Sequence, residues 1–313
     1  MSAMNTELSR RDLLKGMGYG LAALALSTAV VANATVAEAS GEPVNEDAWG
    51  ILIDLTRCTG CQSCALACQE ANDRPYPNHV PITLDTDSYS FVEERQIENS
   101  VGLLETVNVK RQCMHCLHPA CVSACTVGAL RKTAEGPVVY DSEKCIGCRY
   151  CQYACPFGVP TYEWENPLGL IHKCQMCASR LAKDERPACV AACPNGALRF
   201  GVRHELLAQA HAQIISNPER YVEQIYGEYE VGGTSVLYLS PVPFSLLGFP
   251  ELGEEPNPRY AEAVMKQTPA IALTVASVVT ALHLFMQLFM QRREHIKGEV
   301  TVETTTQKPG AEL

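Results

Sequence analysis

Two long apolar stretches stand near the ends of the chain, at residues 17–36 and 269–290. The second contains 22 residues, close to the ~20 that one bilayer crossing needs. Basic residues, beginning with Arg292 and Arg293, follow it directly. We therefore expect one transmembrane helix at residues 268–291.

Short apolar runs between these stretches predict the local elements. The runs predict strands at residues 49–55, 107–110, 137–145 and 235–239. Leu206, Leu207, Ala210 and Ile214 recur at helical spacing, which predicts a helix at 203–215. This part of the chain is long enough, and apolar enough at 47% hydrophobic residues overall, to build a real core.

All sixteen cysteines lie in this central part and fall into four groups of four. The groups are Cys58, Cys61, Cys64 and Cys68; Cys113, Cys116, Cys121 and Cys125; Cys145, Cys148, Cys151 and Cys155; and Cys174, Cys177, Cys189 and Cys193. The first and third groups have the C-x2-C-x2-C-x3-C spacing of bacterial ferredoxins. The second and fourth lengthen the middle gap and keep both ends.

This spacing suits 4Fe–4S clusters. A cubane needs one thiolate on each of four irons, and a tight C-x2-C-x2-C loop can supply three of them. The fourth cysteine comes where the chain turns helical, so it ligates the partner cluster. Four groups of this kind predict four 4Fe–4S clusters whose fourth ligands are exchanged in pairs.

Two other uses of the cysteines compete with clusters. A disulfide framework is typical of short exported domains that have little core. Zinc sites use two pairs of ligands rather than a triplet followed by a single cysteine. Both are disfavoured here, and an exported disulfide or zinc scaffold is the alternative from another functional class.

The cysteine segments also repeat. CTGCQSCALAC at 58–68 parallels CIGCRYCQYAC at 145–155, and CVSACTVGALR at 121–131 parallels CVAACPNGALR at 189–199. An internal duplication of a two-cluster ferredoxin explains both pairs. The predicted fold class is α+β, with duplicated bacterial 2×(4Fe–4S) ferredoxin-like lobes and a C-terminal transmembrane helix.

The N-terminus predicts export. A twin-arginine motif, Arg10 and Arg11, precedes the first apolar stretch, and Ala-x-Ala cleavage sites follow it. The expected domains are a signal peptide at 1–39, the four-cluster ferredoxin domain at 40–240, a proline-rich tether at 241–267, the transmembrane helix at 268–291 and a tail at 292–313. Because the twin-arginine route exports folded proteins, clusters can be inserted before transport. An uncleaved signal anchor is the alternative.

The charges around the second apolar stretch predict its orientation. Glutamates precede the stretch and basic residues follow it, so the positive-inside rule puts the C-terminus in the cytoplasm and the cysteines in the periplasm. Ser277, Thr280, His283 and Gln287 share about a third of the helical circle, which favours contact with another transmembrane subunit over contact with lipid. For His283, a hydrogen bond to a neighbouring helix is favoured over haem or quinone binding.

Composition excludes some functions. The net charge is −10 and no basic stripe is present, so nucleic acid is not an expected partner. The sequence has neither a nucleotide-binding glycine fingerprint nor a flavin motif. We therefore expect a non-catalytic electron-transfer component and not an enzyme.

The runs CMHCLHPACVSAC, CIGCRYCQYACPFGVP and HKCQMC resemble the four-cluster ferredoxin subunits of membrane oxidoreductases. Within that group the chain resembles the HybA-type (hydrogenase-2) iron–sulfur subunits, including the twin-arginine signal and the single C-terminal helix. The segment at 226–244 also resembles the beta subunits of formate dehydrogenases. One departure is that Gln69 and Thr126 stand where proline follows the last cysteine of the other two groups.

The resemblance implies four ligand sets. They are Cys58, Cys61, Cys64 and Cys193; Cys174, Cys177, Cys189 and Cys68; Cys113, Cys116, Cys121 and Cys155; and Cys145, Cys148, Cys151 and Cys125. His115, His118 and His172 lie near cysteines but are surplus to these sets. They are expected to donate hydrogen bonds to sulfur or to lie at a subunit surface.

The resemblance also implies partners. Electrons would pass between the small and large subunits of a periplasmic nickel–iron hydrogenase and an integral membrane, quinone-reactive subunit of the NrfD-like kind. The alternative is the beta subunit of a molybdopterin oxidoreductase such as formate dehydrogenase. The self-carried signal peptide argues mildly against that alternative.

Overall fold

The computed structural model describes residue 45 and residues 47–74, 80–98, 102–166 and 169–305. The chain divides into two compact units, of which Ser40–Glu262 carries all the cysteines. The other contains most of the long C-terminal helix. The predicted signal peptide lies outside the described residues.

The elements of the described chain are mostly short. In order they are β1 (Trp49–Asp54), η1 (Leu55–Arg57), α2 (Ser63–Ala71), β2 (Phe91–Glu98), β3 (Leu104–Arg111), α3 (Ala120–Ser123), β4 (Leu130–Lys132), β5 (Val138–Tyr140), η2 (Ser142–Lys144), α4 (Tyr150–Ala154), β6 (Thr161–Tyr162), β7 (Ile171–His172), α5 (Ala178–Leu181), α6 (Ala188–Ala191), β8 (Leu198–Val202), α7 (Arg203–Ser216), η3 (Glu230–Gly232), β9 (Val236–Leu239) and α8 (Arg259–Thr305).

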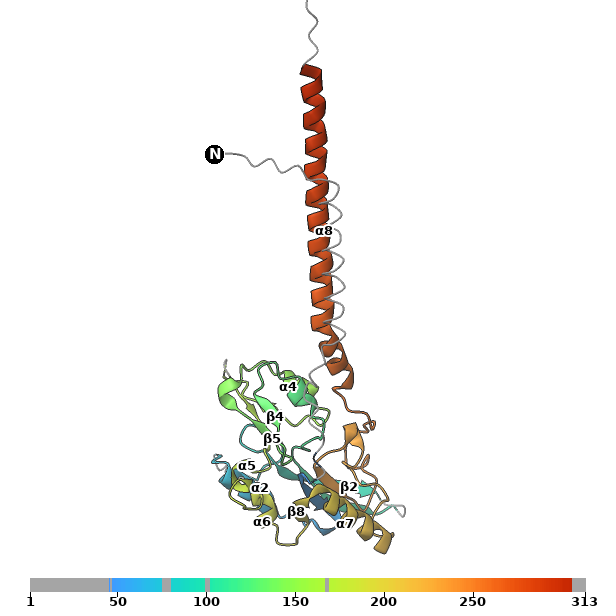
Figure 1. The fold of residues 1–313 in the computed structure, drawn as a ribbon. Coiled ribbons are helices and arrows are strands. Elements are labelled where there is room, and N and C mark those ends of the chain that lie inside the picture. Colours follow the sequence, from blue (N-terminus) through green and yellow to red (C-terminus); the bar gives the residue numbers. More distant parts are fainter. Residues whose placement is uncertain (1–44, 46, 75–79, 99–101, 167–168, 306–313) are drawn as a thin grey trace, which may run out of the picture. The chain divides into compact units, whose positions relative to one another are not determined.

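A three-stranded sheet of order β8-β1-β9 forms the centre of the cysteine-bearing unit (Figure 1). Strand β1 pairs antiparallel with β8 and parallel with β9. Ile51, Leu52 and Ile53 of β1 are completely buried, because both faces of the strand are covered. One face meets the main core and the other meets α7 through Leu206, which confirms the predicted apolar face of that helix.

Most predicted strands are present, and one is shorter than expected. The strand predicted at 137–145 ends at Tyr140. The side chain of Asp141 then accepts a hydrogen bond from the Glu143 amide and caps the 3-10 helix η2. This local bond turns the chain three residues before Cys145, so the second half of the run is a turn.

The same local structure precedes the first cysteine group. Asp54 accepts a hydrogen bond from the Thr56 amide and caps η1, which leads directly to Cys58. In both loops a glycine with positive φ, Gly60 at 71° or Gly147 at 68°, follows the first cysteine. A side chain at either position would be strained, so glycine lets the loop close tightly.

The pairing of strands brings the cysteine groups together two by two. Strand β1, before the first group, pairs with β8, after the fourth, and α2 packs against α6. Strand β5, before the third group, pairs antiparallel with β4, after the second, and α3 packs against α4. The first group is therefore beside the fourth, and the second is beside the third.

The segment expected to be a tether differs from that expectation in its first part. Phe244, Leu247 and Phe249 are buried and belong to the main core. Phe249 lies against the rings of Tyr226 and Tyr238, at centroid distances of 4.7 and 5.0 Å. Burial of these aromatic side chains outweighs the preference of the neighbouring prolines for an extended chain.

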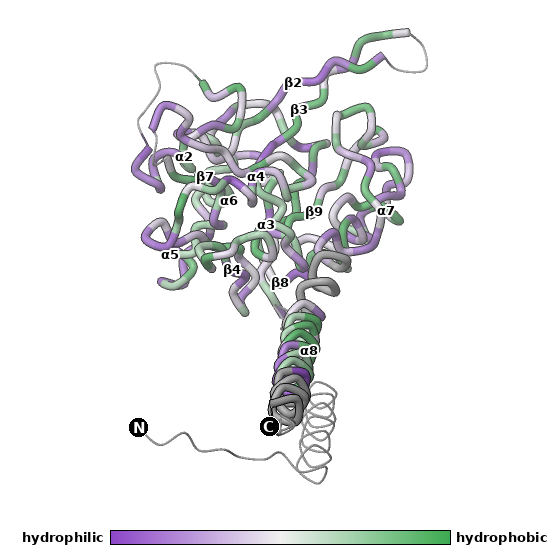
Figure 2. The backbone as a smooth tube through the Cα atoms, turned by 90° about the horizontal axis from the view of Figure 1, so that it is seen from above, coloured by the Kyte–Doolittle hydropathy of each residue, from purple (hydrophilic) through white to green (hydrophobic). Residues whose placement is uncertain are grey.

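A β-hairpin made of β2 and β3 interrupts the cysteine groups and extends from this unit (Figure 2). Its outer end is polar or exposed, and Leu103 and Leu104 are 64% and 69% exposed. Its inner end enters the core through Val107 and Val109 and leads to Cys113. The β2–β3 hairpin thus runs from the exposed Leu103 and Leu104 to the second cysteine group, which begins at Cys113.

Helix α8 contains a candidate membrane span, Ala270–Arg293, on grounds of length and hydropathy. Ser277 and Thr280 each donate to the carbonyl four residues earlier in the same helix, at 2.8 Å. Gln287 Nε2 lies 3.0 Å from His283 Nε2. The polar stripe predicted here therefore satisfies much of its hydrogen bonding within α8 itself.

The two capping aspartates make a matched pair for a stability test. Asp54 is 1% exposed and also accepts from Thr56 Oγ1 at 2.6 Å and from Tyr221 Oη at 3.0 Å. We expect Asp54→Ala to lower the free energy of unfolding by about 2–3 kcal/mol, because buried donors lose their acceptor. Asp141→Ala, at an exposed cap, should cost far less. Thermal unfolding of the full chain in detergent, followed by circular dichroism, checks this; equal losses would contradict it.

Candidate metal centres

All sixteen cysteines lie in the described part of the chain, and none of them forms a disulfide. Cys58, Cys61, Cys64 and Cys193 form what we name the first set. The pKa of Cys58 is raised by burial and further by its neighbours Cys64, Cys193 and Cys61. Cys61 is exposed, and hydrogen bonds from Ser63 lower the pKa of its thiol.

The second set is Cys68, Cys174, Cys177 and Cys189, from the first and fourth groups. Burial holds the pKa of Cys174 well above its ordinary value, and Cys68, Cys177 and Cys189 are among the neighbours that raise it. Burial also raises the pKa of Cys189 to about 12, although the positive charge of Lys110 acts to lower it.

The third set, Cys113, Cys116, Cys121 and Cys155, comes from the second and third groups. Burial raises the pKa of Cys116 well above its ordinary value, and the other three members add to the shift. For Cys121 burial raises the pKa to about 12, although Lys173 opposes it.

The fourth set is Cys125, Cys145, Cys148 and Cys151, again from the second and third groups. Burial raises the pKa of Cys151 to about 11, and Cys125, Cys145 and Cys148 contribute in that order. Cys148 is exposed, as Cys61 is in the first set. At Cys58, Cys116, Cys121, Cys151, Cys174 and Cys189 burial favours the neutral thiol, so binding of a metal to these residues displaces protons.

Amide groups donate hydrogen bonds to several of these sulfurs. Cys174 Sγ accepts from the Met176 amide at 3.3 Å, Cys125 Sγ from the Ala129 amide at 3.2 Å and Cys145 Sγ from the Gly147 amide at 3.5 Å. Such bonds stabilise thiolate ligands and raise the potential of iron–sulfur clusters.

Three buried nitrogen donors test whether a cluster fits. Lys110 Nζ, Gln112 Nε2 and His115 Nε2 find no hydrogen-bond partner in the part of the chain that the structure describes. His115 Nδ1 accepts from the Val138 amide, and burial keeps the pKa of this imidazole well below its usual range, so Nε2 carries the proton. A bound cluster would supply acceptor sulfides for such donors, so the residues present fit the group.

The described residues contain no three His, Cys, Asp or Glu side chains close enough together to hold a single metal ion. A cubane makes a different demand. Each of its thiolates binds a separate iron at a different corner, so the four sulfurs stand farther apart than the ligands of one ion. A set that does not form a single-ion site can therefore still hold such a cluster.

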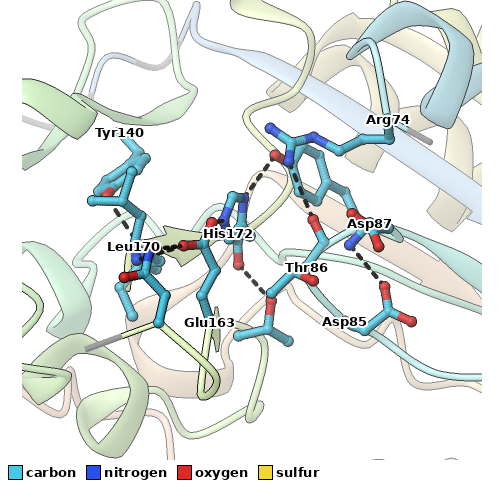
Figure 3. Close-up of polar contacts among 12 residues, drawn as sticks. Arg74, Asp85, Thr86, Asp87, Tyr140, Glu163, Leu170 and His172 are labelled. Atoms are coloured by element: carbon cyan, nitrogen blue, oxygen red, sulfur yellow. Dashed lines mark hydrogen bonds and ion pairs between the residues drawn. The ribbon is translucent and has the colours of Figure 1, made fainter. Parts of the chain in front are cut away.

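The histidines near the cysteines have different surroundings. His172 is buried and lies beside Glu163 (Figure 3). With its proton on Nε2, the ring donates to Glu163 Oε1 at 2.5 Å and accepts from Tyr89 Oη at 3.2 Å on Nδ1. Both ring nitrogens of His172 therefore have these partners, and neither donates the expected hydrogen bond to sulfur.

Sequence reasoning missed the buried lysines around the sets. Lys110 and Lys173 are 1% and 3% exposed, and the pKa of the half-buried Lys132 is lowered by burial to about 8. Alternation gave no such signal, because it puts Lys110 on the strand face opposite Val107 and Val109.

Comparison with known proteins defines the class. The profile of the 4Fe–4S dicluster domain matches residues 104–203. A protein of Nitratidesulfovibrio vulgaris is 39% identical over 97% of this chain and 83% of its own length. Hydrogenase-2 operon protein HybA of Escherichia coli O157:H7 is 36% identical over 79% of this chain and 85% of its own length. The iron–sulfur subunit of nitrate-inducible formate dehydrogenase from Escherichia coli K12 is 37% identical over 60% and 66%.

These matches and the four cysteine sets define a 4Fe–4S protein of the ferredoxin type. Within that class the HybA relative is matched over most of both chains. The chain belongs to the HybA family.

Glu163 offers a test of how the last cysteine segment is held. It accepts from His172, from the Leu170 amide at 3.3 Å and from Asn166 at 3.1 Å, and so ties the β6–β7 hairpin that leads into Cys174. We expect Glu163→Ala to speed exchange of the amides at 170–172 roughly fivefold at pH 7, as for the loss of one net hydrogen bond.

The effect should depend on pH. The hydrogen bond from His172 lowers the pKa of the Glu163 carboxyl, so its contribution is present above the ordinary pKa and is lost as the pH falls through the lowered value. Hydrogen exchange read by mass spectrometry should show the variant and the wild type converging at acid pH. The neighbouring Glu165→Ala is the control; equal effects of the two changes would refute the role of Glu163.

Proposed function

We propose that this chain is a non-catalytic electron-transfer subunit that carries four 4Fe–4S clusters, one on each cysteine set. The observation that carries the proposal is the grouping of sixteen free cysteines into four neighbourhoods of four, each with three members from one sequence group and the fourth from another. Its iron–sulfur character has independent support from the dicluster profile.

Two duplicated lobes would hold the clusters in pairs. The repeated order of strand, aspartate cap, glycine loop and helix at Cys58 and Cys145 supports duplication. The antiparallel pairing of β1 with β8, and of β5 with β4, supports the same division. One lobe then holds the first and second sets, and the other holds the third and fourth.

The neighbours shared between sets give the clusters a linear order. Cys64 of the first set lies near Cys68 and Cys189 of the second, and Cys174 of the second lies near Cys113 of the third. Cys151 lies near Cys121, which joins the fourth set to the third. The exposed Cys61 and Cys148 belong to the first and fourth sets, so electrons would enter and leave at opposite ends. When bound, each cluster supplies reversible one-electron transfer.

The partners we propose are the small and large subunits of a periplasmic nickel–iron hydrogenase on one side and an integral membrane quinone-reactive subunit on the other. The longer match to HybA than to the formate dehydrogenase subunits supports this choice. The candidate span Ala270–Arg293, followed by basic residues, supports a membrane anchor with the clusters on the periplasmic side. The second candidate partner is a molybdopterin oxidoreductase such as formate dehydrogenase. It is supported by the 37% identity, over 60% of this chain, to the iron–sulfur subunit of nitrate-inducible formate dehydrogenase.

Exchange of the fourth ligand can be tested with single substitutions. Cys125 belongs by sequence to the second group but in this proposal ligates the fourth cluster. We expect Cys125→Ala to alter the same electron paramagnetic resonance signal as Cys148→Ala, because both remove a ligand of one cluster. Cys116→Ala is the control and should alter a different signal. If Cys125→Ala and Cys116→Ala changed the same signal, the exchange would be refuted.

Co-purification tests the partners. The full chain, tagged in its natural host and extracted from membranes with mild detergent, should bring nickel and a hydrogenase large subunit with it. Metal analysis and mass spectrometry of the complex are the measurements. Molybdenum with a molybdopterin subunit, in the absence of nickel, would favour the formate dehydrogenase alternative.

A further inference from the structure

Lys110 occupies a position where a lysine is not expected. It lies near the inner end of β3, opposite Val92 of β2, and is 1% exposed. Its carbonyl accepts a hydrogen bond from Tyr238 Oη at 2.9 Å, which links its backbone to β9. The strand pairing and this bond hold the residue in place.

The ammonium of Lys110 has no hydrogen-bond acceptor among the described residues. A buried charge without a partner is strongly unfavourable, so such groups are normally paired or neutral. The charged neighbours of this ammonium include Cys64, Cys189 and Cys68. A buried, unpaired Nζ beside cysteines of this kind is placed to face a negatively charged group bound by them.

Two other lysines near the cysteines, the half-buried Lys132 and the buried Lys173, have ordinary partners. Lys132 Nζ donates to the His115 carbonyl and to Ser235 Oγ, each at 3.1 Å. Lys173 Nζ donates to the carbonyls of Val138 and Cys174 at 2.6 and 2.9 Å. Of the three, Lys110 is the one whose Nζ has no hydrogen-bond acceptor among the described residues.

The cysteines near Lys110 belong to two different sets. Cys64 is in the first set, whereas Cys68 and Cys189 are in the second. On β3 the residue two positions earlier, Asn108, donates to the Cys58 carbonyl at 3.3 Å. The same strand therefore meets the first cysteine loop and carries a positive charge to the junction between the first and second sets.

We propose that Lys110 is a positioning residue whose ammonium is shared as a counter-charge by the first and second clusters and raises the reduction potentials of both. Reduction adds one electron to a cluster and breaks no bond. The reduced cluster is more negative by one charge, so a fixed cation beside it stabilises the reduced form more than the oxidised form. The inference rests on the four-cluster function proposed above.

The test is a redox titration of the full chain, purified anaerobically in mild detergent and followed by electron paramagnetic resonance. Lys110→Met removes the charge and keeps most of the side-chain volume. We expect two of the four potentials to fall and two to stay unchanged. Lys110→Arg keeps the charge and should leave all four close to the wild type. The control Lys183→Met removes an exposed lysine and should shift none of the four.

Each outcome decides the matter. Unchanged potentials in a fully loaded Lys110→Met chain would overturn the proposal. If Lys110→Met loses iron while Lys110→Arg retains it, the clusters require the charge, and the proposal stands. If both variants lose iron equally, the residue fills space and the proposal fails. A wild-type chain with too little iron for four clusters would instead overturn the proposed function, so the two failures are distinguishable.

Discussion

A cubane cluster requires four thiolates at the corners of a tetrahedron, and a single short loop supplies three of them. The fourth must come from elsewhere in the chain. In this protein the cysteine four residues beyond each triplet lies in or beside a short helix, at Cys68, Cys125, Cys155 and Cys193. The exchange of these four ligands that we propose would explain why α2 packs on α6 and α3 on α4.

Strand pairing follows from the same requirement. The first cysteine group can meet the fourth, more than a hundred residues later, because β1 and β8 pair side by side. The burial that this produces also raises the pKa of the Cys116, Cys174 and Cys189 thiols. Because a thiol must lose its proton to bind a metal, the burial of these residues couples folding to metal binding.

The cysteine spacing was enough to predict an iron–sulfur protein, and the apolar patterns were enough to predict β1, β9 and α7. Each of these features depends on residues close together in the chain. The burial of Phe244, Leu247 and Phe249 could not, because it depends on Tyr226 and Tyr238 presenting a complementary aromatic surface. Local proline content suggested an extended chain instead.

The buried polar groups were also beyond sequence reasoning. A lysine within a strand is normally exposed, and only the structure shows that Lys110 is buried near cysteines of two sets. His172 illustrates the converse: its nearness to Cys174 in sequence suggested a contact with sulfur, yet its ring is engaged by Glu163 and Tyr89.

The number of clusters is the central claim, and the iron and acid-labile sulfide content of the anaerobically purified full chain tests it most directly. Four cubanes predict about sixteen irons and about sixteen sulfides per chain. About twelve irons or fewer in an intact, anaerobically purified chain would contradict the account. Iron without a matching amount of sulfide would contradict it as well.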